Sequence, residues 1–193
     1  MQGLYAFKPW YTRRLGGIVD AAVARGVSPD VFTLAGVIAA AAAAVAVAYG
    51  WWPLVIVLLG ARLAGANLDG AVARARGVSR PWGFVLNEIG DRTSDLVVFA
   101  GLAALAVRTG GSVVWVLVAA LAATLPTFAS LAAAGAGATR RNGGPFGKTE
   151  RCLAVVVACA LPAILGWVCI VIVAGSVLTT ATRLVGTHRE LAA

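Results

Sequence analysis

The sequence predicts an all-α, polytopic membrane protein with six transmembrane helices and an N-terminal juxtamembrane helix. Its 193 residues are 60% hydrophobic and only 12% charged, and the mean hydropathy is +0.88. Soluble domains carry about 25% charged residues, so this composition is typical of a membrane protein. The apolar residues also come in long uninterrupted runs, as spanning helices require. We expect residues 1–193 to form a single membrane domain.

The basic residues and the cysteines exclude several other classes of protein. The formal net charge is +8, but the basic residues lie between apolar runs, which indicates membrane topology better than nucleic-acid binding. The three cysteines lie in or beside apolar runs without a CxxC motif, which favours packing over disulfides or metal binding. The single histidine, His188, lies near the C-terminus, so a catalytic imidazole elsewhere is excluded.

Six apolar segments define the expected spans. They cover residues 31–49, 53–67, 84–107, 113–134, 152–161 and 164–185. The boundary between the last two depends on one helix breaker, Pro162. The first 17 residues are mixed and basic, and they lack the apolar core and cleavage site of a signal peptide. They predict a helix that lies at the membrane surface.

The distribution of basic residues predicts the orientation in the membrane. Lysines and arginines gather before the first span, between spans two and three, between spans four and five, and at the C-terminus. The opposite side has only Arg108. By the positive-inside rule, both termini are expected in the cytoplasm, with the chain in a bacterial inner or plasma membrane. Trp51, Trp52 and Trp115 suit the outer interface.

Charged side chains interrupt the second and third spans at one depth. They are Arg62, Asp69, Glu88, Asp91, Arg92 and Asp95. A charge at the bilayer centre costs about 2.5–3.5 kcal/mol, so these groups must lie near a surface or face a hydrated interior. Asp69 follows Trp51 by about 27 Å of helix, and Asp91 precedes Arg108 by about 25 Å. Both aspartates are therefore expected just inside the cytoplasmic boundary.

Two chemical interpretations of this cluster are open. Carboxylates in a partly dry site repel each other unless a proton or a cation joins them, and oxygen ligands favour Mg²⁺ or Mn²⁺. In the alternative interpretation, the same groups only pair with one another. The pairs in question are Asp69 with Arg62 or Arg74, and Arg92 with Glu88 or Asp95.

Residues 67–91 contain a spaced motif. It reads Asn67-Leu-Asp-Gly-Ala-Val-Ala-Arg74, then eight residues, then Gly83-Phe-Val-Leu-Asn87-Glu-Ile-Gly-Asp91. The motif resembles the signature of the CDP-alcohol phosphatidyltransferase family, D-x-x-D-G-x-x-A-R-x8-G-x3-D-x3-D. Six fixed residues recur at the family spacing: Asp69, Gly70, Ala73, Arg74, Gly83 and Asp91. The segments 27–33 and 144–151 resemble the family's entry to its first span and its loop before the fifth, so the resemblance covers nearly the whole chain.

Two positions depart from the signature. Ala66 stands where the first aspartate belongs, and Asn87 stands at the third. Asn67 and Asp95 are nearby polar groups that could compensate. Sliding the pattern so that Asp91 and Asp95 form the last pair breaks the spacing from Gly83, and we reject that alignment.

The resemblance implies an enzyme of phospholipid biosynthesis. It would transfer a phosphatidyl group from a CDP-activated lipid, such as CDP-diacylglycerol, to an alcohol and release CMP. The two departures leave open a catalytically impaired relative that binds the CDP-lipid. An unrelated transporter or structural membrane protein fits least well, because the motif spacing is kept. The family is usually dimeric, so we expect a homodimer.

The resemblance also implies metal ligands and a base. In the family, the aspartates hold two divalent ions on the donor diphosphate, which implies Mg²⁺ or Mn²⁺ at Asp69, Asn87 and Asp91. Asn87 offers an oxygen but no charge, and Ala66 offers no ligand atom. Asp91 is the expected general base that takes the proton of the acceptor hydroxyl.

Further residues are implied in binding the two substrates. The expected contacts to the CDP group are Asp30, Thr33, Gly70, Arg74, Arg80 and Gly83. Lys148 and Arg151 are expected to bind an anionic acceptor, with Arg183 as a third candidate. Membrane topology explains Lys148 and Arg151 equally well.

Overall fold

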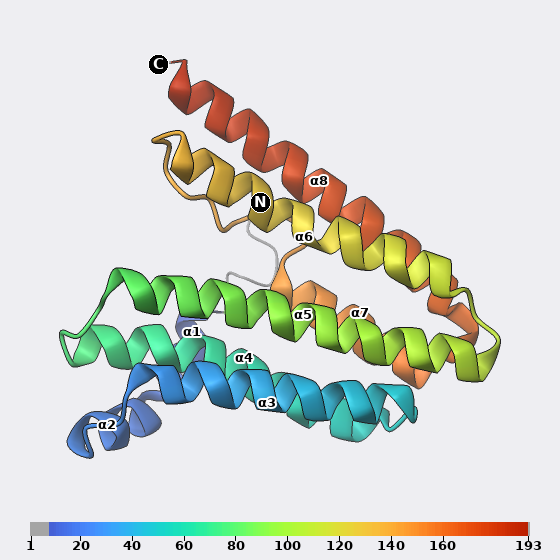
Figure 1. Cartoon of the computed structure of the whole chain (residues 1–193), viewed down its shortest axis with the longest axis horizontal. Helices are drawn as coiled ribbons and strands as arrows, with labels where there is room; N and C mark the ends of the chain where they lie inside the picture. Colours follow the sequence, from blue (N-terminus) through green and yellow to red (C-terminus); the bar gives the residue numbers. More distant parts are fainter. Residues whose placement is uncertain (1–7, 193) are drawn as a thin grey trace. The chain divides into compact units, whose positions relative to one another are not determined.

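The computed structural model describes residues 8–192, and within them every regular element is a helix (Figure 1). The helices are α1 Lys8–Arg14, α2 Gly16–Ala24, α3 Pro29–Ala48, α4 Trp52–Ala75, α5 Pro81–Thr109, α6 Val113–Gly135, α7 Lys148–Ala160, the 3₁₀ turn η2 Pro162–Ile164, and α8 Leu165–Leu191. The all-α prediction is therefore confirmed for the described residues.

Four helical segments of the described part are long and apolar enough to cross a membrane. They are α3, α4, α6 and the segment Pro162–Leu191, which joins η2 to α8. The chain is therefore an integral membrane protein, but the predicted count of six spans is not reached by this measure. Helix α5 has 29 residues but carries several charges in its first half. Helix α7 has 13 residues, about 20 Å of rise against about 30 Å of hydrocarbon.

The helix boundaries follow the signals in the sequence. Ser28 accepts a hydrogen bond from the backbone N–H of Asp30 and precedes Pro29 at the first helical position of α3. The predicted break at Pro162 is confirmed, because α7 ends at Ala160 and α8 begins at Leu165.

The expected juxtamembrane segment, residues 1–17, contains the short helix α1, and residues 1–7 lie outside the described part. A second short helix, α2, follows it. Both short helices pack against α4. The Tyr11 hydroxyl donates to the Gly60 carbonyl oxygen at 3.1 Å, and burial raises the pKa of Tyr11. This contact fastens α1 to α4.

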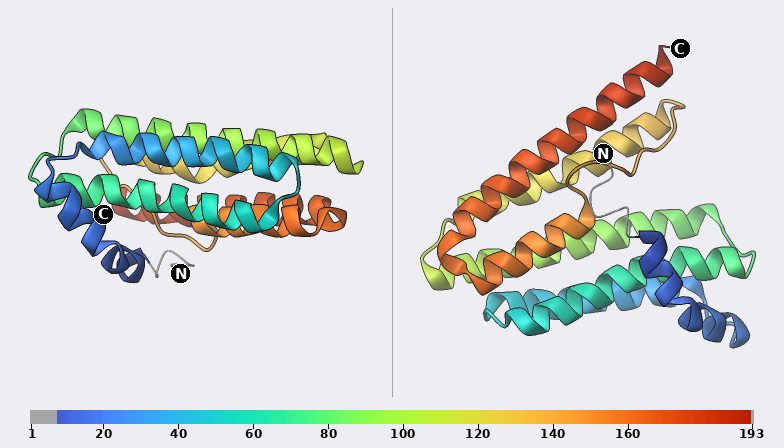
Figure 2. Two further views of the ribbon diagram at one scale, coloured as in Figure 1. Left: turned by 90° about the horizontal axis from the view of Figure 1, so that it is seen from below. Right: turned by 180° about the vertical axis from the view of Figure 1, so that it is seen from behind.

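The chain divides into two compact units, and the boundary falls within α5 between Ala104 and Leu105. In the N-terminal unit, α3 and α4 run side by side in opposite directions (Figure 2). Glycines allow their backbones to approach closely: a Cβ atom on Gly65 would lie 2.6 Å from the Phe32 carbonyl oxygen and 2.9 Å from the Gly36 Cα. Small residues thus set the distance between these two helices.

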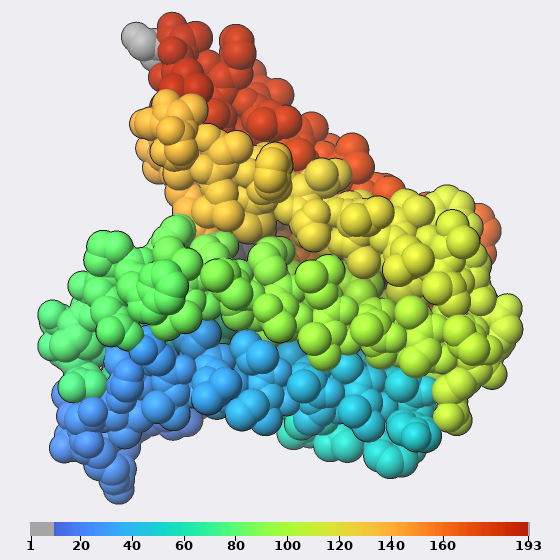
Figure 3. Space-filling model, viewed as in Figure 1, coloured from blue at the N-terminus to red at the C-terminus, as the bar shows by residue number. Residues whose placement is uncertain are grey.

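The first part of α5 packs on α3 in the same manner. Gly90 lies against Thr33 and Val37, and a Cβ atom on Gly101 would overlap the backbone of Ala44. Figure 3 shows α3 and α5 in contact along one face of the N-terminal unit. This packing brings residues 87–95 of α5 beside the cytoplasmic half predicted for α3 and α4. In the C-terminal unit, α6 and α7 both pack against α8.

Replacing Gly65 by alanine is expected to destabilise the N-terminal unit. The new Cβ atom meets backbone that must move, and such overpacking costs about 1–3 kcal/mol. The melting temperature of the purified protein in detergent measures the loss. Gly60→Ala is the matched control on the same helix, because its Cβ would meet nothing within 4 Å. Alanine is favoured there by up to about 1 kcal/mol, so equal melting temperatures for the two variants would contradict the packing argument.

Candidate functional site

The Asp69 carboxylate joins α3, α4 and α5. It is only 6% exposed. One oxygen accepts hydrogen bonds from the Thr33 hydroxyl, at 2.9 Å, and from the Asn87 side-chain amide, and the other accepts from the Gly70 backbone N–H at 2.5 Å. The structure therefore brings together three positions of the signature, Asp69, Gly70 and Asn87, with Thr33 from the segment that leads into the first span, and these residues lie up to 54 positions apart in the sequence.

Asp91, the expected base, follows Asn87 by one helical turn on the same face of α5. Its side chain is half-buried. Its backbone carbonyl oxygen accepts a hydrogen bond from Arg62 Nη2 at 3.4 Å. Since Asn87 contacts Asp69 directly, Asp91 lies one turn from that contact, which agrees with the similar depth predicted for the two aspartates.

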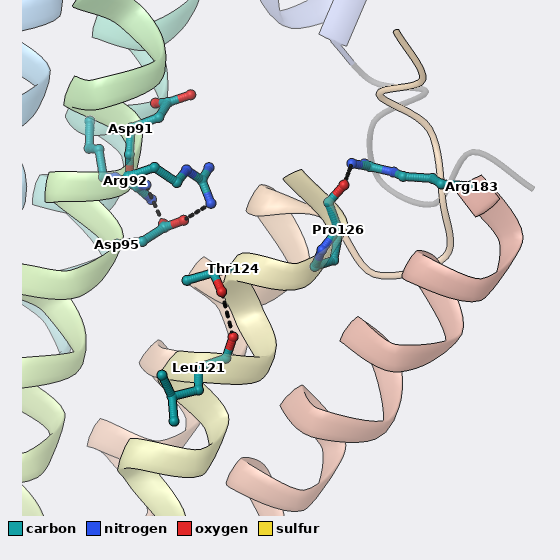
Figure 4. Close-up of polar contacts among 8 residues, drawn as sticks. Asp91, Arg92, Asp95, Leu121, Thr124, Pro126 and Arg183 are labelled. Carbon is teal, nitrogen blue, oxygen red and sulfur yellow. Dashed lines mark hydrogen bonds and ion pairs between the residues drawn. The ribbon is translucent and has the colours of Figure 1, made fainter. Parts of the chain in front are cut away.

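Asp95 continues the same face of α5 and is neutralised by two arginines. Its Oδ1 lies 2.5 Å from Arg62 Nη2, and its Oδ2 lies 3.1 Å from Arg92 Nη1. Figure 4 shows the pair formed with Arg92. The expected pairing of Arg92 with Asp95 is confirmed, whereas the pairing of Asp69 with Arg62 is wrong, because Arg62 turns to Asp95. Arg62 and Asp95 are 3% and 7% exposed, so this network lies inside the protein.

The groups that could compensate for Ala66 are engaged elsewhere. The Asn67 amide donates to the Leu63 carbonyl oxygen at 2.9 Å, one turn back along α4. Both carboxylate oxygens of Asp95 are paired with guanidinium groups.

The other residues expected to contact the CDP group lie at the ends of the same helices. Asp30, at the start of α3, forms an ion pair with Arg80, which directly precedes α5. The Arg74 guanidinium covers Gly70, with Nη1 at 3.1 Å from the position that a Cβ atom would take. Arg80 packs beside Gly83 in a similar way.

The donor set does not fit the pair of divalent ions that the signature implies. Among residues 8–192, no group of three histidine, cysteine, aspartate or glutamate side chains lies close enough to hold a metal ion. Ala66 has no ligand atom. Asn87 directs its N–H, rather than its carbonyl oxygen, at Asp69. Of the four carboxylates in the signature, the chain keeps two, those of Asp69 and Asp91.

The expected acceptor-binding residues belong to the C-terminal unit. Lys148 is the first residue of α7, and Arg151 lies one turn later and is 5% exposed. The Glu150 carboxylate accepts the Gly147 backbone N–H at 2.8 Å and so fixes the start of this helix.

Arg183, the third acceptor candidate, fastens a loop instead. Its Nε and Nη2 each donate at 2.8 Å, to the carbonyl oxygens of Gly143 and Asn142. Its Nη1 donates to the Pro126 carbonyl oxygen at 2.6 Å (Figure 4) and to the Ser130 hydroxyl at 2.9 Å. The guanidinium thereby links α8, α6 and the loop before α7.

The same loop makes a second attachment to α8. The Thr179 hydroxyl bonds both the backbone N–H and the carbonyl oxygen of Phe146. The Phe146 ring lies against Gly175, where a Cβ atom would be 2.5 Å away from it. The loop that carries the Gly-Pro-Phe-Gly sequence is therefore held from two positions on α8.

The signature on α4 and α5, in this helical membrane fold, defines a lipid-modifying transferase. The CDP-alcohol phosphatidyltransferase family profile matches residues 26–179, and the chain belongs to that family. It is an enzyme of the CDP-alcohol phosphatidyltransferase class, which transfers a phosphatidyl group from a CDP-activated lipid to an alcohol with release of CMP.

Two relatives of known function are similar in sequence. The phosphatidylinositol phosphate synthase of Mycolicibacterium smegmatis is 31% identical over 157 residues, which cover 78% of this chain and 69% of the relative. The phosphatidylinositol phosphate synthase of Cutibacterium acnes is 32% identical over 117 residues, which cover 58% of this chain and 55% of the relative.

Solved structures of Mycobacterium tuberculosis phosphatidylinositol phosphate synthase, PgsA1, have a similar fold. The structure with CDP-DAG bound has a TM-score of 0.76 and 27% identity, and the match covers 91% of this chain and 94% of PgsA1. The structure in complex with manganese and citrate has a TM-score of 0.74 and 26% identity, and the match covers 89% of this chain and 87% of PgsA1.

Sequence reasoning missed two features of the site. It did not find that Thr33 bonds Asp69, since a threonine in an apolar helix gives no partner. It also did not find the loop attachment by Arg183, although an arginine at the end of an apolar run is a usable signal.

Asp95→Asn is expected to destabilise the protein by about 3–5 kcal/mol, because it leaves the buried Arg62 guanidinium without its anion. Thermal unfolding in detergent measures this loss. Asp20→Asn, an exposed position on α2, is the control and should unfold like the parent. The double variant R62M/D95L removes both charges and should recover much of the stability. A single D95N variant as stable as D20N would contradict the buried pair.

Arg183→Lys is expected to lower the melting temperature. Lysine keeps the charge but lacks the planar fork that reaches separate acceptors, and hydrogen bonds to charged groups contribute about 1.5–3 kcal/mol each. Arg189→Lys, exposed on the same helix, should have no effect. An R183K protein with unchanged melting temperature and a raised KM for the acceptor would instead assign Arg183 to acceptor binding.

Proposed function

We propose that this enzyme transfers the phosphatidyl group of CDP-diacylglycerol to a phosphate-bearing inositol. The observation that carries the proposal is the contact between Asp69 and Asn87, with Asp91 one turn further. These signature positions lie in a fold shared with an enzyme that was solved with CDP-DAG bound. Both relatives of known function are phosphatidylinositol phosphate synthases.

The proposed reaction is a displacement at phosphorus. The acceptor hydroxyl oxygen forms a bond to the phosphorus that carries the diacylglycerol, and the bridging bond to CMP breaks. CMP leaves with the bonding electrons. The Asp91 carboxylate takes the hydroxyl proton. Its half-buried place on α5 lets it reach a substrate while part of the site stays dry.

The donor is proposed to lie across the beginnings of α3 and α5 and the end of α4. Gly70 and Gly83 would let the nucleotide approach the backbone, and the Arg74 guanidinium beside Gly70 would bind a phosphate oxygen. Asp30 and Arg80 would contact the nucleoside from their ion pair. Thr33 acts through Asp69, whose carboxylate it holds.

A divalent cation, Mg²⁺ or Mn²⁺, is proposed at Asp69 and Asp91, with the Asn87 oxygen as a further ligand. Such an ion would supply charge neutralisation at the donor diphosphate. The support is the carboxylate chemistry of this site and the manganese in the PgsA1 complex.

Lys148 and Arg151 are proposed to bind the acceptor phosphate. They are the two basic side chains of the first turn of α7. A buried arginine can bind a phosphate through two parallel, charge-assisted hydrogen bonds, and a neutral acceptor offers no anionic group for this pair.

We also propose that α5 and α7 complete a set of six spans with the active site on the cytoplasmic side. The support is the distribution of the basic residues along the sequence, since they gather near both termini and in the connections α4–α5 and α6–α7, as the positive-inside rule expects of cytoplasmic segments. A homodimer stays a prediction from the family resemblance.

Binding of the CDP-lipid without turnover is the second candidate function. Ala66 and Asn87 favour it, because each removes a carboxylate from the signature.

The test is CMP release from CDP-diacylglycerol by the purified chain. Release is expected with inositol phosphate in the presence of Mg²⁺ or Mn²⁺, and little with inositol, serine or glycerol phosphate. Asp91→Asn should lower the rate about 10²–10⁴-fold, the contribution of a positioned base. Asp20→Asn is the matched control and should keep full activity.

Several outcomes would contradict parts of the proposal. Unchanged CMP release by D91N would remove Asp91 from the base role, and full activity in saturating EDTA would remove the cation. Tight CDP-diacylglycerol binding with no CMP release for any of these alcohols would establish the non-catalytic function.

A further inference from the structure

We infer that this chain has lost one of the two cation positions of its family's signature, and that the Asn87 amide takes over that cation's contact with Asp69. The inference rests on the proposed function for the identity of the site. It concerns the binding of Mn²⁺ itself, so it is tested without substrate.

The chain lacks two of the carboxylate ligands that the signature provides for cations. Ala66 and Asn87 replace two of the four signature aspartates. The nearest polar groups do not replace them, because Asn67 bonds the Leu63 carbonyl oxygen and Asp95 is paired with two arginines. Within residues 8–192, no third histidine, cysteine, aspartate or glutamate joins Asp69 and Asp91 in a group that could hold a metal ion.

The Asn87 side-chain amide is oriented as a hydrogen-bond donor to Asp69. Its side-chain N–H group points at the same Asp69 oxygen that accepts the Thr33 hydroxyl, while the other oxygen accepts the Gly70 N–H. Donors thus meet both oxygens of a carboxylate that is 6% exposed. An aspartate at position 87 would repel Asp69 and require a cation between them, whereas the asparagine amide satisfies Asp69 without one.

The number of carboxylates at the site limits the positive charge that it can hold. Four carboxylates neutralise two divalent ions, but the two carboxylates left here neutralise one. A second divalent ion would leave an excess positive charge in a partly dry site, which is strongly unfavourable. Two further acidic side chains of this region, Asp30 and Asp95, are already paired with arginines.

The experiment is a Mn²⁺ titration of the purified chain in detergent, with free Mn²⁺ followed by electron paramagnetic resonance. The parent is expected to bind one Mn²⁺ per chain. The variant A66D/N87D, which restores the signature, is expected to bind two. N87D alone should bind Mn²⁺ about tenfold more tightly than the parent, because the ligand charge sets the affinity.

Asn67→Asp is the matched control, since it adds the same charge to α4 at a position whose side chain turns away to Leu63. It should keep the parent stoichiometry and affinity. Two ions bound by the parent, or none, would overturn the inference, as would N87D and A66D/N87D proteins that are folded by thermal unfolding but bind like the parent. The titration measures Mn²⁺ binding and not CMP release. A failure of the proposed reaction can therefore be told apart from a failure of this inference.

Discussion

The buried carboxylate of Asp69 is the constraint on which the N-terminal unit depends. A charge inside a helical membrane protein is stable only if surrounding groups solvate it. Thr33, Asn87 and the Gly70 N–H do so from α3, α5 and α4 itself. Because each helix contributes a donor, the register of all three is fixed at this depth. The glycine contacts of Gly65 and Gly101 allow the backbones to come close enough for these short side chains to meet.

A second buried network supports the first one. Arg62 pairs with Asp95 and also bonds the Asp91 carbonyl oxygen, so it links α4 to two turns of α5. Asp69 and Arg62 lie seven residues apart on α4, about two helical turns, and therefore share a face. The same face of α4 therefore contacts α5 at two positions along the helix. Asp91 lies between them on α5, one turn from Asn87 and one turn from the ion pair of Asp95 with Arg62.

Much of this arrangement follows from the sequence. Apolar run lengths and Pro162 predict the positions of the long helices, and the spacing from Asp69 to Asp91 predicts the site, because these depend on local pattern and rise per residue. The ion-pair partner of Arg62 does not follow from the sequence, because the sequence places both Asp69 and Asp95 within reach of this arginine. The direction of the Asn87 amide is likewise set by three-dimensional contacts. The N-terminal residues predict a surface helix, but the hydrogen bond that holds α1 on α4 through Tyr11 does not follow from them.

The central claim is that α4 and α5 form a donor site around Asp69 and Asp91 with one cation. A crystal or electron microscopy structure of the chain with Mn²⁺ and CDP-diacylglycerol tests it most directly. We predict one manganese peak between these aspartates, in contact with the donor diphosphate, and the Asn87 side chain still in contact with Asp69. Two manganese density peaks, or a diphosphate bound away from these helices, would contradict a one-cation donor site on α4 and α5.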